Sequence, residues 1–220
     1  ITELGGGAHP DRYDKLFNIL LQEPKGQIDW VDISQYMIDL AKQYIDNDNY
    51  QERKEVINFI TSDILDYLSN LEDNSLDFAL MKYTFDHIQD IEKLFQLLQS
   101  KLKTGGKLIS TMTALNPQLK SISTNARFLY NGEEFPVDEK RILKDGDSFT
   151  IKFFKVSNDP SQGYLEGAQT TKYFYSSEKI QELAKKYNFD IFLGDWKDFV
   201  KPENQDNLEI DQPILVLSKN

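Results

Sequence analysis

Short runs of apolar residues alternate along most of this chain with segments whose apolar positions recur every three or four residues. The short runs read as strands and cover Ile1 to Leu4, Ile28 to Ile33, Val56 to Ile60, Leu76 to Met81 and Lys107 to Met112. The segments between them are predicted to be amphipathic helices, because residues spaced by three and four share one helical face. This alternation is typical of a mostly parallel sheet with helices on both faces.

Four amphipathic helices and a helical turn at residues 66 to 71 are predicted from the spacing. Ser34 is a candidate N-cap, because its hydroxyl can accept a hydrogen bond from a backbone N–H of the first turn. A polar loop is expected from Asp46 to Glu55, and the third helix should end at Gly105-Gly106. The apolar faces of the four helices are Tyr13, Leu16, Phe17, Leu20 and Leu21; Met37, Leu40, Ala41, Tyr44 and Ile45; Ile91, Leu94, Phe95, Leu98 and Leu102; and Ile180, Leu183, Ala184 and Tyr187.

The helical spacing disappears between about residues 113 and 175. Asn131-Gly132 and Asp145-Gly146 are turn signals beside the alternating run from Phe149 to Val156, which favours antiparallel strands. We interpret this stretch as an insertion that lies over one edge or over the mouth of the main sheet. Its aromatic residues are expected to form either the core of an added β-layer or a substrate-facing surface. They are Phe128, Tyr130, Phe135, Phe149, Phe153, Phe154, Tyr164 and Tyr173.

The last two strand-like runs, Phe189 to Gly194 and Pro213 to Ser218, have no helical pattern between them and should pair antiparallel. We therefore predict an α/β fold with a Rossmann-like, doubly wound, mostly parallel seven-stranded sheet that ends in an antiparallel hairpin. A length of 220 residues fits a single domain spanning residues 1 to 220. Because Ile1 stands within an apolar strand, we also expect sequence before residue 1.

Composition narrows the possible partners. A formal net charge of −11 argues against nucleic acid, whose binding depends on clustered Lys and Arg, so a small molecule or a protein fits better. No apolar run approaches the ~18 residues of a membrane span. The sequence contains no cysteine, which excludes disulfides and thiolate metal sites, and we expect no metal. No signal-peptide pattern is present, so the cytoplasm is the default location.

The residues that follow the predicted strands carry the candidate chemistry, because ligands of open α/β sheets bind at the carboxyl ends of the strands. The first strand leads into Glu3-Leu4-Gly5-Gly6-Gly7, whose glycines permit a tight turn against a ligand or simply pack helix on strand. Asp32 closes the second strand, where it can bind both hydroxyls of a ribose or cap a helix. Ser62-Asp63 follows the third strand and could hydrogen-bond an adenine edge or act as an N-cap.

These residues resemble, over nearly the whole chain, the class I S-adenosylmethionine-dependent methyltransferases. In that family an acidic-Leu-Gly-X-Gly loop contacts the methionine end of the cofactor, which implies Glu3, Gly5 and Gly7 here. The resemblance also implies Lys82, directly after the fourth strand, as a cofactor-binding residue. The implied function is transfer of the sulfonium methyl group to a nucleophilic oxygen, nitrogen or carbon of a small-molecule acceptor, with S-adenosylhomocysteine as product.

The adenosine end of the cofactor is assigned by the same resemblance. An acid at the end of the second strand holds the ribose in this family, which implies Asp32, with Ile33 and Met37 flanking the adenine. An acid after the third strand reads the adenine amino group, which implies Asp63 together with Ile64.

The fourth strand and its continuation resemble a further family motif. Asp77 to Ile88 is similar to the "D…HHI" pattern of many small-molecule members, and His87 occupies the second His position. If the resemblance holds, Tyr83, Asp86 and His87 lie near the reacting methyl. His87 is the candidate base because an unperturbed imidazole titrates near neutrality, with Tyr83 as the second catalytic candidate. A packing role for His87 at a strand-to-helix turn remains an alternative.

His9 is the departure from the family pattern, since many members have a further glycine there. A histidine adopts positive φ less readily than glycine, so the loop is expected to turn differently. Pro10 suits the first position of a helix and predicts that the first helix begins at once.

Three other functions remain open. A nicotinamide-dependent dehydrogenase would share the glycine loop and the ribose acid, but its fingerprint requires a glycine where Pro10 stands. A methyltransferase-like module without activity would keep the fold and bind a protein partner. A nucleic-acid methyltransferase is disfavoured by the acidic charge.

Overall fold

The computed structural model describes residues 1–23, 26–46, 48–112, 117–157, 159–195 and 213–220. Its centre is a seven-stranded sheet of order β11-β12-β5-β4-β1-β2-β3. All neighbours from β5 to β3 are parallel, and β12 is antiparallel to both β5 and β11. The strands are β1 (Thr2–Leu4), β2 (Ile28–Asp32), β3 (Ile57–Thr61), β4 (Leu76–Met81), β5 (Leu102–Thr111), β11 (Phe189–Asp195) and β12 (Pro213–Lys219).

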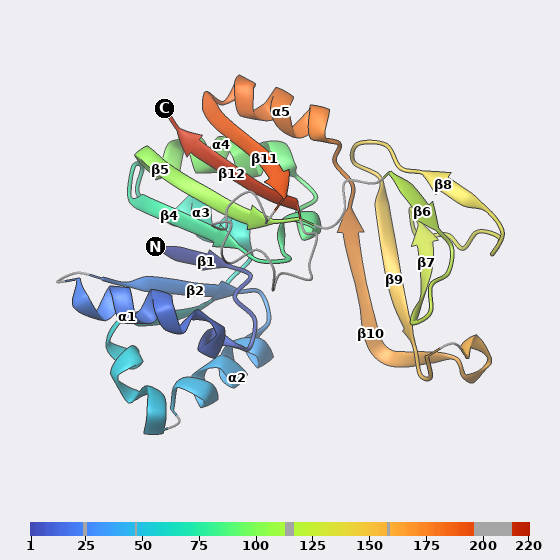
Figure 1. The fold of residues 1–220 in the computed structure, drawn as a ribbon, viewed down its shortest axis with the longest axis horizontal. Coiled ribbons are helices and arrows are strands. Elements are labelled where there is room, and N and C mark those ends of the chain that lie inside the picture. The colour runs from blue at the N-terminus through green and yellow to red at the C-terminus, as the bar shows by residue number, and fades with distance from the viewer. Residues whose placement is uncertain (24–25, 47, 113–116, 158, 196–212) are drawn as a thin grey trace, which may run out of the picture.

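Helices cover both faces of this sheet, so the predicted doubly wound fold with its antiparallel hairpin is confirmed (Figure 1). Trp30 and Val31 show the two layers, because adjacent residues of β2 enter different cores. Trp30 belongs to the core that α1 and α2 cover, and Val31 belongs to the core that α3, α4 and α5 cover on the other face. The helices are α1 (Asp14–Gln22), α2 (Gln35–Ile45), α3 (Ile64–Asn70), α4 (Ile91–Lys101) and α5 (Ser177–Lys186), with short 3-10 helices η1 (Pro10–Tyr13), η2 (Asp48–Glu55), η3 (Phe85–His87) and η4 (Pro160–Gln162).

The stretch between β5 and α5 forms two small antiparallel sheets, as its turn signals predicted. One has the order β10-β9-β7 and the other pairs β6 with β8. Figure 1 shows these strands on the side toward which β1 and β5 point, which is the mouth of the main sheet. Their bounds are β6 (Gln118–Lys120), β7 (Ala126–Tyr130), β8 (Lys140–Ile142), β9 (Ser148–Phe154) and β10 (Tyr164–Tyr173).

The aromatic residues of the insertion divide between its core and its surface. Phe135 is buried in a small cluster with Leu119, Leu143 and Phe174, against which Phe128, Tyr130 and Phe149 pack. Phe153 and Tyr164 are 38% and 37% exposed. The expected β-layer core is therefore present, while a substrate-facing role for the exposed rings stays a prediction.

Three local predictions are wrong. The buried face of α2 is Ile38, Ala41 and Ile45, whereas Met37 and Tyr44 are each 38% exposed. The predicted and the observed residues both recur at helical spacing, so the spacing alone does not decide which of them face the sheet. The third predicted helix does not reach Gly105-Gly106: α4 ends at Lys101, and the glycines lie inside β5 where its register with β4 shifts. The polar loop after α2 contains the 3-10 helix η2.

Candidate functional site

Two cavities meet at the carboxyl ends of β1, β2 and β4, where the sequence placed the site. The larger has a volume of about 400 Å³ and the smaller about 180 Å³. Gly5, Lys82 and Tyr83 line both cavities and therefore lie at their junction. The combined space is of the size that small-molecule sites occupy.

Nearly all predicted site residues line these cavities. Glu3 and Gly7 line the smaller one, and the larger one is lined by Asp32, Ile33, Asp63, Ile64 and His87. Met37 lines neither cavity. Its backbone N–H lies 3.4 Å from the Ser34 hydroxyl, which caps α2, and its side chain is partly exposed. The structure thus brings together the predicted site residues except Met37 and Asp86, and Asp86 is buried outside the linings of both cavities.

The glycine loop needs its glycines for reasons of geometry. Gly5 and Gly7 have φ of +78° and +62°, in the left-handed region that favours glycine. At Gly6 the constraint is space, because an added Cβ would lie 2.4 Å from the Trp30 indole. Trp30 in turn donates a hydrogen bond from Nε1 to the Gly7 carbonyl at 2.9 Å. The loop is therefore held tightly over the end of β1.

His9 does not disturb this loop. Its φ is −123°, so the position needs no left-handed residue, and the imidazole packs against Tyr44 with ring centroids 5.0 Å apart. Pro10 begins η1, as predicted. The departure from the family pattern is thus accommodated by an ordinary backbone conformation.

Asp32 joins the glycine loop to the end of β2. Its Oδ2 accepts a hydrogen bond from the Gly7 N–H at 2.9 Å, and its Oδ1 accepts one from the Ser34 N–H at 2.8 Å. Each carboxylate oxygen can accept more than one hydrogen bond, so the side chain keeps capacity for a pair of ligand hydroxyls. The carboxylate is oriented before any ligand arrives.

Asp63 acts as the N-cap of α3. Its Oδ1 accepts hydrogen bonds from the backbone N–H groups of Leu65 and Asp66 at 2.8 and 3.3 Å. Within the described residues its Oδ2 makes no hydrogen bond. Capping and ligand binding, which the sequence left as alternatives, can therefore use different oxygens of the same side chain.

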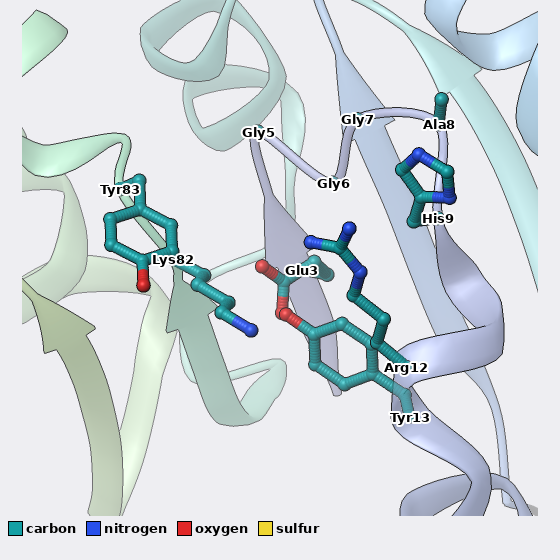
Figure 2. A pocket seen from close by; sticks show the side chains of 10 residues that line it. All are labelled: Glu3, Gly5, Gly6, Gly7, Ala8, His9, Arg12, Tyr13, Lys82 and Tyr83. Atoms are coloured by element: carbon teal, nitrogen blue, oxygen red, sulfur yellow. The ribbon is translucent and has the colours of Figure 1, made fainter. Parts of the chain in front are cut away.

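Glu3 is the least solvated acid of the site. It has no exposed surface, and the Tyr13 hydroxyl and Lys82 are the groups that act on its carboxylate. Burial raises the pKa of Glu3 to about 7, although the Tyr13 hydroxyl and Lys82 oppose the rise. Figure 2 shows the side chains of Arg12 and Lys82 pointing into the same space. A buried acid and two cations therefore line one small cavity.

Tyr83 and His87 follow β4 at the junction and at the wall of the larger cavity. Tyr83 has φ of +59°, a strained conformation for a bulky residue, and its N–H donates to Thr111 Oγ1 at 2.9 Å. His87 Nδ1 lies 2.9 Å from the carbonyl oxygen of Thr171 in β10. Burial, followed by the charge of Lys172, lowers the pKa of His87.

Sequence reasoning missed several residues of the site. Arg12 and Tyr13 line the smaller cavity, and Thr84 and Ile88 line the larger one. Tyr13 was assigned only to the apolar face of the first helix, but its ring packs edge-on against Trp30 while its hydroxyl faces Glu3. A signal existed for Arg12, since it is the first cation after the glycine loop. Nothing in the sequence linked His87 to Thr171.

The part of the chain that the structure describes lacks two kinds of feature. No cluster of three or more His, Asp or Glu side chains there could hold a metal ion. No helix there is long and apolar enough to cross a membrane.

Comparison with known proteins agrees with the fold. Residues 14–110 match the family model of the methyltransferase domain. Demethylmenaquinone methyltransferase of Chlamydia pneumoniae is 29% identical over 172 residues, which are 78% of this chain and 66% of that protein. Malonyl-(acyl-carrier protein) O-methyltransferase 2 of Ilyobacter polytropus is 33% identical over 133 residues, 58% of this chain and 48% of that protein. The chain thus spans about half to two thirds of the length of these two relatives.

Solved structures show the same architecture. An S-adenosylmethionine-dependent methyltransferase from Clostridium acetobutylicum superposes with a TM-score of 0.57 and 18% identity, covering 100% of this chain and 83% of that one. At this identity the likeness concerns the fold, whereas the family match rests on the sequence. Together they show that residues 14–110 match a methyltransferase domain and that the chain has the fold of S-adenosylmethionine-dependent methyltransferases.

Proposed function

We propose that this chain binds S-adenosylmethionine across the two joined cavities and transfers its methyl group to a small-molecule acceptor. The observation that carries the proposal is the smaller cavity, where the fully buried carboxyl of Glu3 lies beside Arg12 and Lys82. An α-amino acid group carries one positive and one negative charge. Glu3 suits its ammonium group, and the two cations suit its carboxylate.

The larger cavity suits the adenosine part. Asp32 offers a carboxylate that the backbone of Gly7 and Ser34 already orients, as ribose hydroxyls require. Asp63 lies in the same cavity with Oδ2 available to an amino group, and Ile33 and Ile64 supply apolar walls. These residues fit the cofactor that the family uses.

The protein's own contribution to the reaction is alignment. When bound, the cofactor supplies a methyl group already activated by a sulfonium, so the protein needs no covalent catalyst. The residues shared by the cavities, Gly5, Lys82 and Tyr83, would surround the centre of the ligand. His87, on the wall of the larger cavity, is the proposed base, and Tyr83 is the proposed aromatic contact to the acceptor.

The acceptor is proposed to be a small molecule, which the printed names of the relatives support by analogy and the charge of −11 supports against nucleic acid. A cytoplasmic location and a single domain over residues 1 to 220 stay predictions from the sequence.

Product formation tests this function. Purified protein is incubated with S-adenosylmethionine and small hydroxyl, phenol, amine and carboxylic acid acceptors, and S-adenosylhomocysteine is quantified by mass spectrometry. We expect product above the acceptor-free control for at least one acceptor class, and at least tenfold less with Asp32→Ala. Asp39→Asn is the matched control, since Asp39 is an exposed acid of α2 whose side chain, within the described residues, bonds only to Gln35. Cofactor binding without product for any acceptor would favour a binding module instead.

A further inference from the structure

Strand β10 of the insertion lies directly against the segment that carries His87. His87 Nδ1 is 2.9 Å from the Thr171 carbonyl oxygen and 3.4 Å from the Thr170 hydroxyl. One residue further along, Lys172 Nζ lies 3.6 Å from Asp86 Oδ2, and the two side chains are only 13% and 9% exposed. The insertion and the segment after β4 are therefore joined at His87 itself, across 84 residues of sequence.

The contact with Thr171 decides which nitrogen of His87 carries the proton. A carbonyl oxygen can only accept a hydrogen bond, so the neutral imidazole must be protonated at Nδ1. Its Nε2 then holds the lone pair and is the atom that can take up a proton. The side chain belongs to the wall of the larger cavity, which places this acceptor at the proposed site.

The charges around His87 come from three places. Asp86 precedes it in η3, Lys172 faces it from β10, and Asp32, Asp63 and Lys82 line the same cavity. Burial and Lys172 lower the pKa of His87, while the Thr171 hydrogen bond and Asp86 oppose this. The net effect favours the neutral imidazole, the form that a base requires.

We propose that β10 is part of the catalytic apparatus, with Thr171 and Lys172 as positioning residues that hold His87 as the Nδ1–H tautomer with Nε2 ready to accept a proton. The inference rests on the proposed function and adds the class of acceptor, which is a group that loses a proton on methylation, such as a hydroxyl, a phenol or a primary or secondary amine. In the balanced step the acceptor O or N forms a bond to the methyl carbon. The carbon–sulfur bond breaks with its electron pair going to sulfur, and the acceptor proton moves to His87 Nε2.

Nitrogen-15 NMR of the whole chain tests this without cofactor or acceptor. The sequence contains only two histidines, so His9→Gln leaves His87 as the single imidazole. Long-range proton–nitrogen correlation spectra distinguish the tautomers and follow the titration. We expect the Nδ1–H tautomer above the titration midpoint, and an Nε2–H tautomer would overturn the proposal.

Variants of Lys172, made in the same His9→Gln background, test the positioning role. Lys172→Met removes a cation that faces His87, so the His87 midpoint should move to higher pH, while Lys172→Arg should keep it near the starting value. Lys152→Met is the matched control, because Lys152 lies on the neighbouring strand β9 and its Nζ contacts the Tyr164 ring instead. An equal midpoint in Lys172→Met and Lys152→Met would contradict the role of Lys172.

If Lys172→Met does not fold, the double variant Asp86→Asn/Lys172→Met removes both charges of the pair together. We expect His87 to keep the Nδ1–H tautomer in this variant. Loss of that tautomer would count against the hydrogen bond to β10. Because His9 lines the smaller cavity, S-adenosylhomocysteine is titrated against the chain that keeps His9, and this titration separates the two hypotheses. Binding with the wrong tautomer rejects only the role of β10. The Nδ1–H tautomer without binding rejects the proposed function.

Discussion

At the scale of single residues, Glu3 shows a conflict between stability and function. The Glu3 carboxyl has no exposed surface and a pKa of about 7. Its ionised form therefore lowers the stability of the fold at neutral pH and above. An apolar or amide side chain in β1 would avoid that cost. The presence of an acid there is understandable if its charge is used for a cationic ligand group.

Glu3→Gln should therefore stabilise the protein at alkaline pH. The pKa of Glu3 rises from 4.5 to about 7 on folding, so the folded state binds the proton more tightly. The protonated Glu3 side chain contributes its full share of the free energy of unfolding below pH 4.5. This contribution is lost as the pH rises through about 7. The free energy of unfolding falls by on the order of 3 kcal/mol in total, and a Gln side chain avoids this loss because it does not ionise. Urea unfolding at pH 8 and pH 4.5 measures the difference, with a gain expected mainly at pH 8.

Glu72→Gln is the control for this experiment, since Glu72 is an exposed acid. It should change the free energy of unfolding by less than about 0.5 kcal/mol at both pH values. If Glu3→Gln is no more stable than the wild type at pH 8, the buried charge is not costly, and the interpretation of Glu3 is wrong.

Asp32→Ala should weaken binding of S-adenosylhomocysteine by about 1.5 to 3 kcal/mol, because charge-assisted hydrogen bonds to the ribose are lost. The same substitution removes the acceptor for the Gly7 and Ser34 N–H groups, so some loss of stability is also expected. Calorimetry at a temperature where the variant remains folded measures the affinity. Unchanged affinity beside an unchanged Asp39→Asn control would refute the ribose role.

At the scale of elements, the sequence predicted where helices begin better than which face they bury. Ser34 was predicted as the N-cap of α2 and fills that role, because capping depends on local chemistry. The face assignment that included Met37 and Tyr44 failed because two overlapping apolar sets fit the same helical period. The strand that follows α4 began earlier than expected, since Gly105 and Gly106 form an irregularity within β5.

Ser34→Ala should lower stability modestly through loss of the helix cap. The Ser34 hydroxyl accepts from the Met37 N–H at 3.4 Å, a long hydrogen bond, so the expected cost is about 0.5 to 1 kcal/mol. For a chain of this size this corresponds to a fall in melting temperature of about 1 to 4 °C. Ser177→Ala is the control, because Ser177 is the first residue of α5 and not its N-cap, and among the described residues its hydroxyl bonds only to Glu178. Equal melting temperatures for the two variants would contradict the capping role.

At the scale of the whole molecule, the parallel and antiparallel parts of the sheet followed from local pattern, while the strand order and the contacts between distant segments did not. The alternation of strands and helices gave the parallel part, and the missing helix between β11 and β12 gave the hairpin. The site was predictable in so far as Gly5, Asp32 and Asp63 stand at strand ends. The approach of β10 to His87 was not, because a single carbonyl contact across the fold leaves no periodic trace.

The family match itself begins at residue 14, after the glycine loop. The assignment of that loop to the cofactor therefore depends on the geometry of Glu3, Gly5 and Gly7 and on their link to Asp32. Evidence for the binding site must come from the ligand itself.

Isothermal titration calorimetry with S-adenosylhomocysteine, with NAD as the parallel ligand, is the most direct measurement. We predict saturable binding of one S-adenosylhomocysteine per chain, weakened by Asp32→Ala, and no heat of binding with NAD. Binding of NAD without binding of S-adenosylhomocysteine, or binding of neither to the folded chain, would contradict the assignment of these cavities.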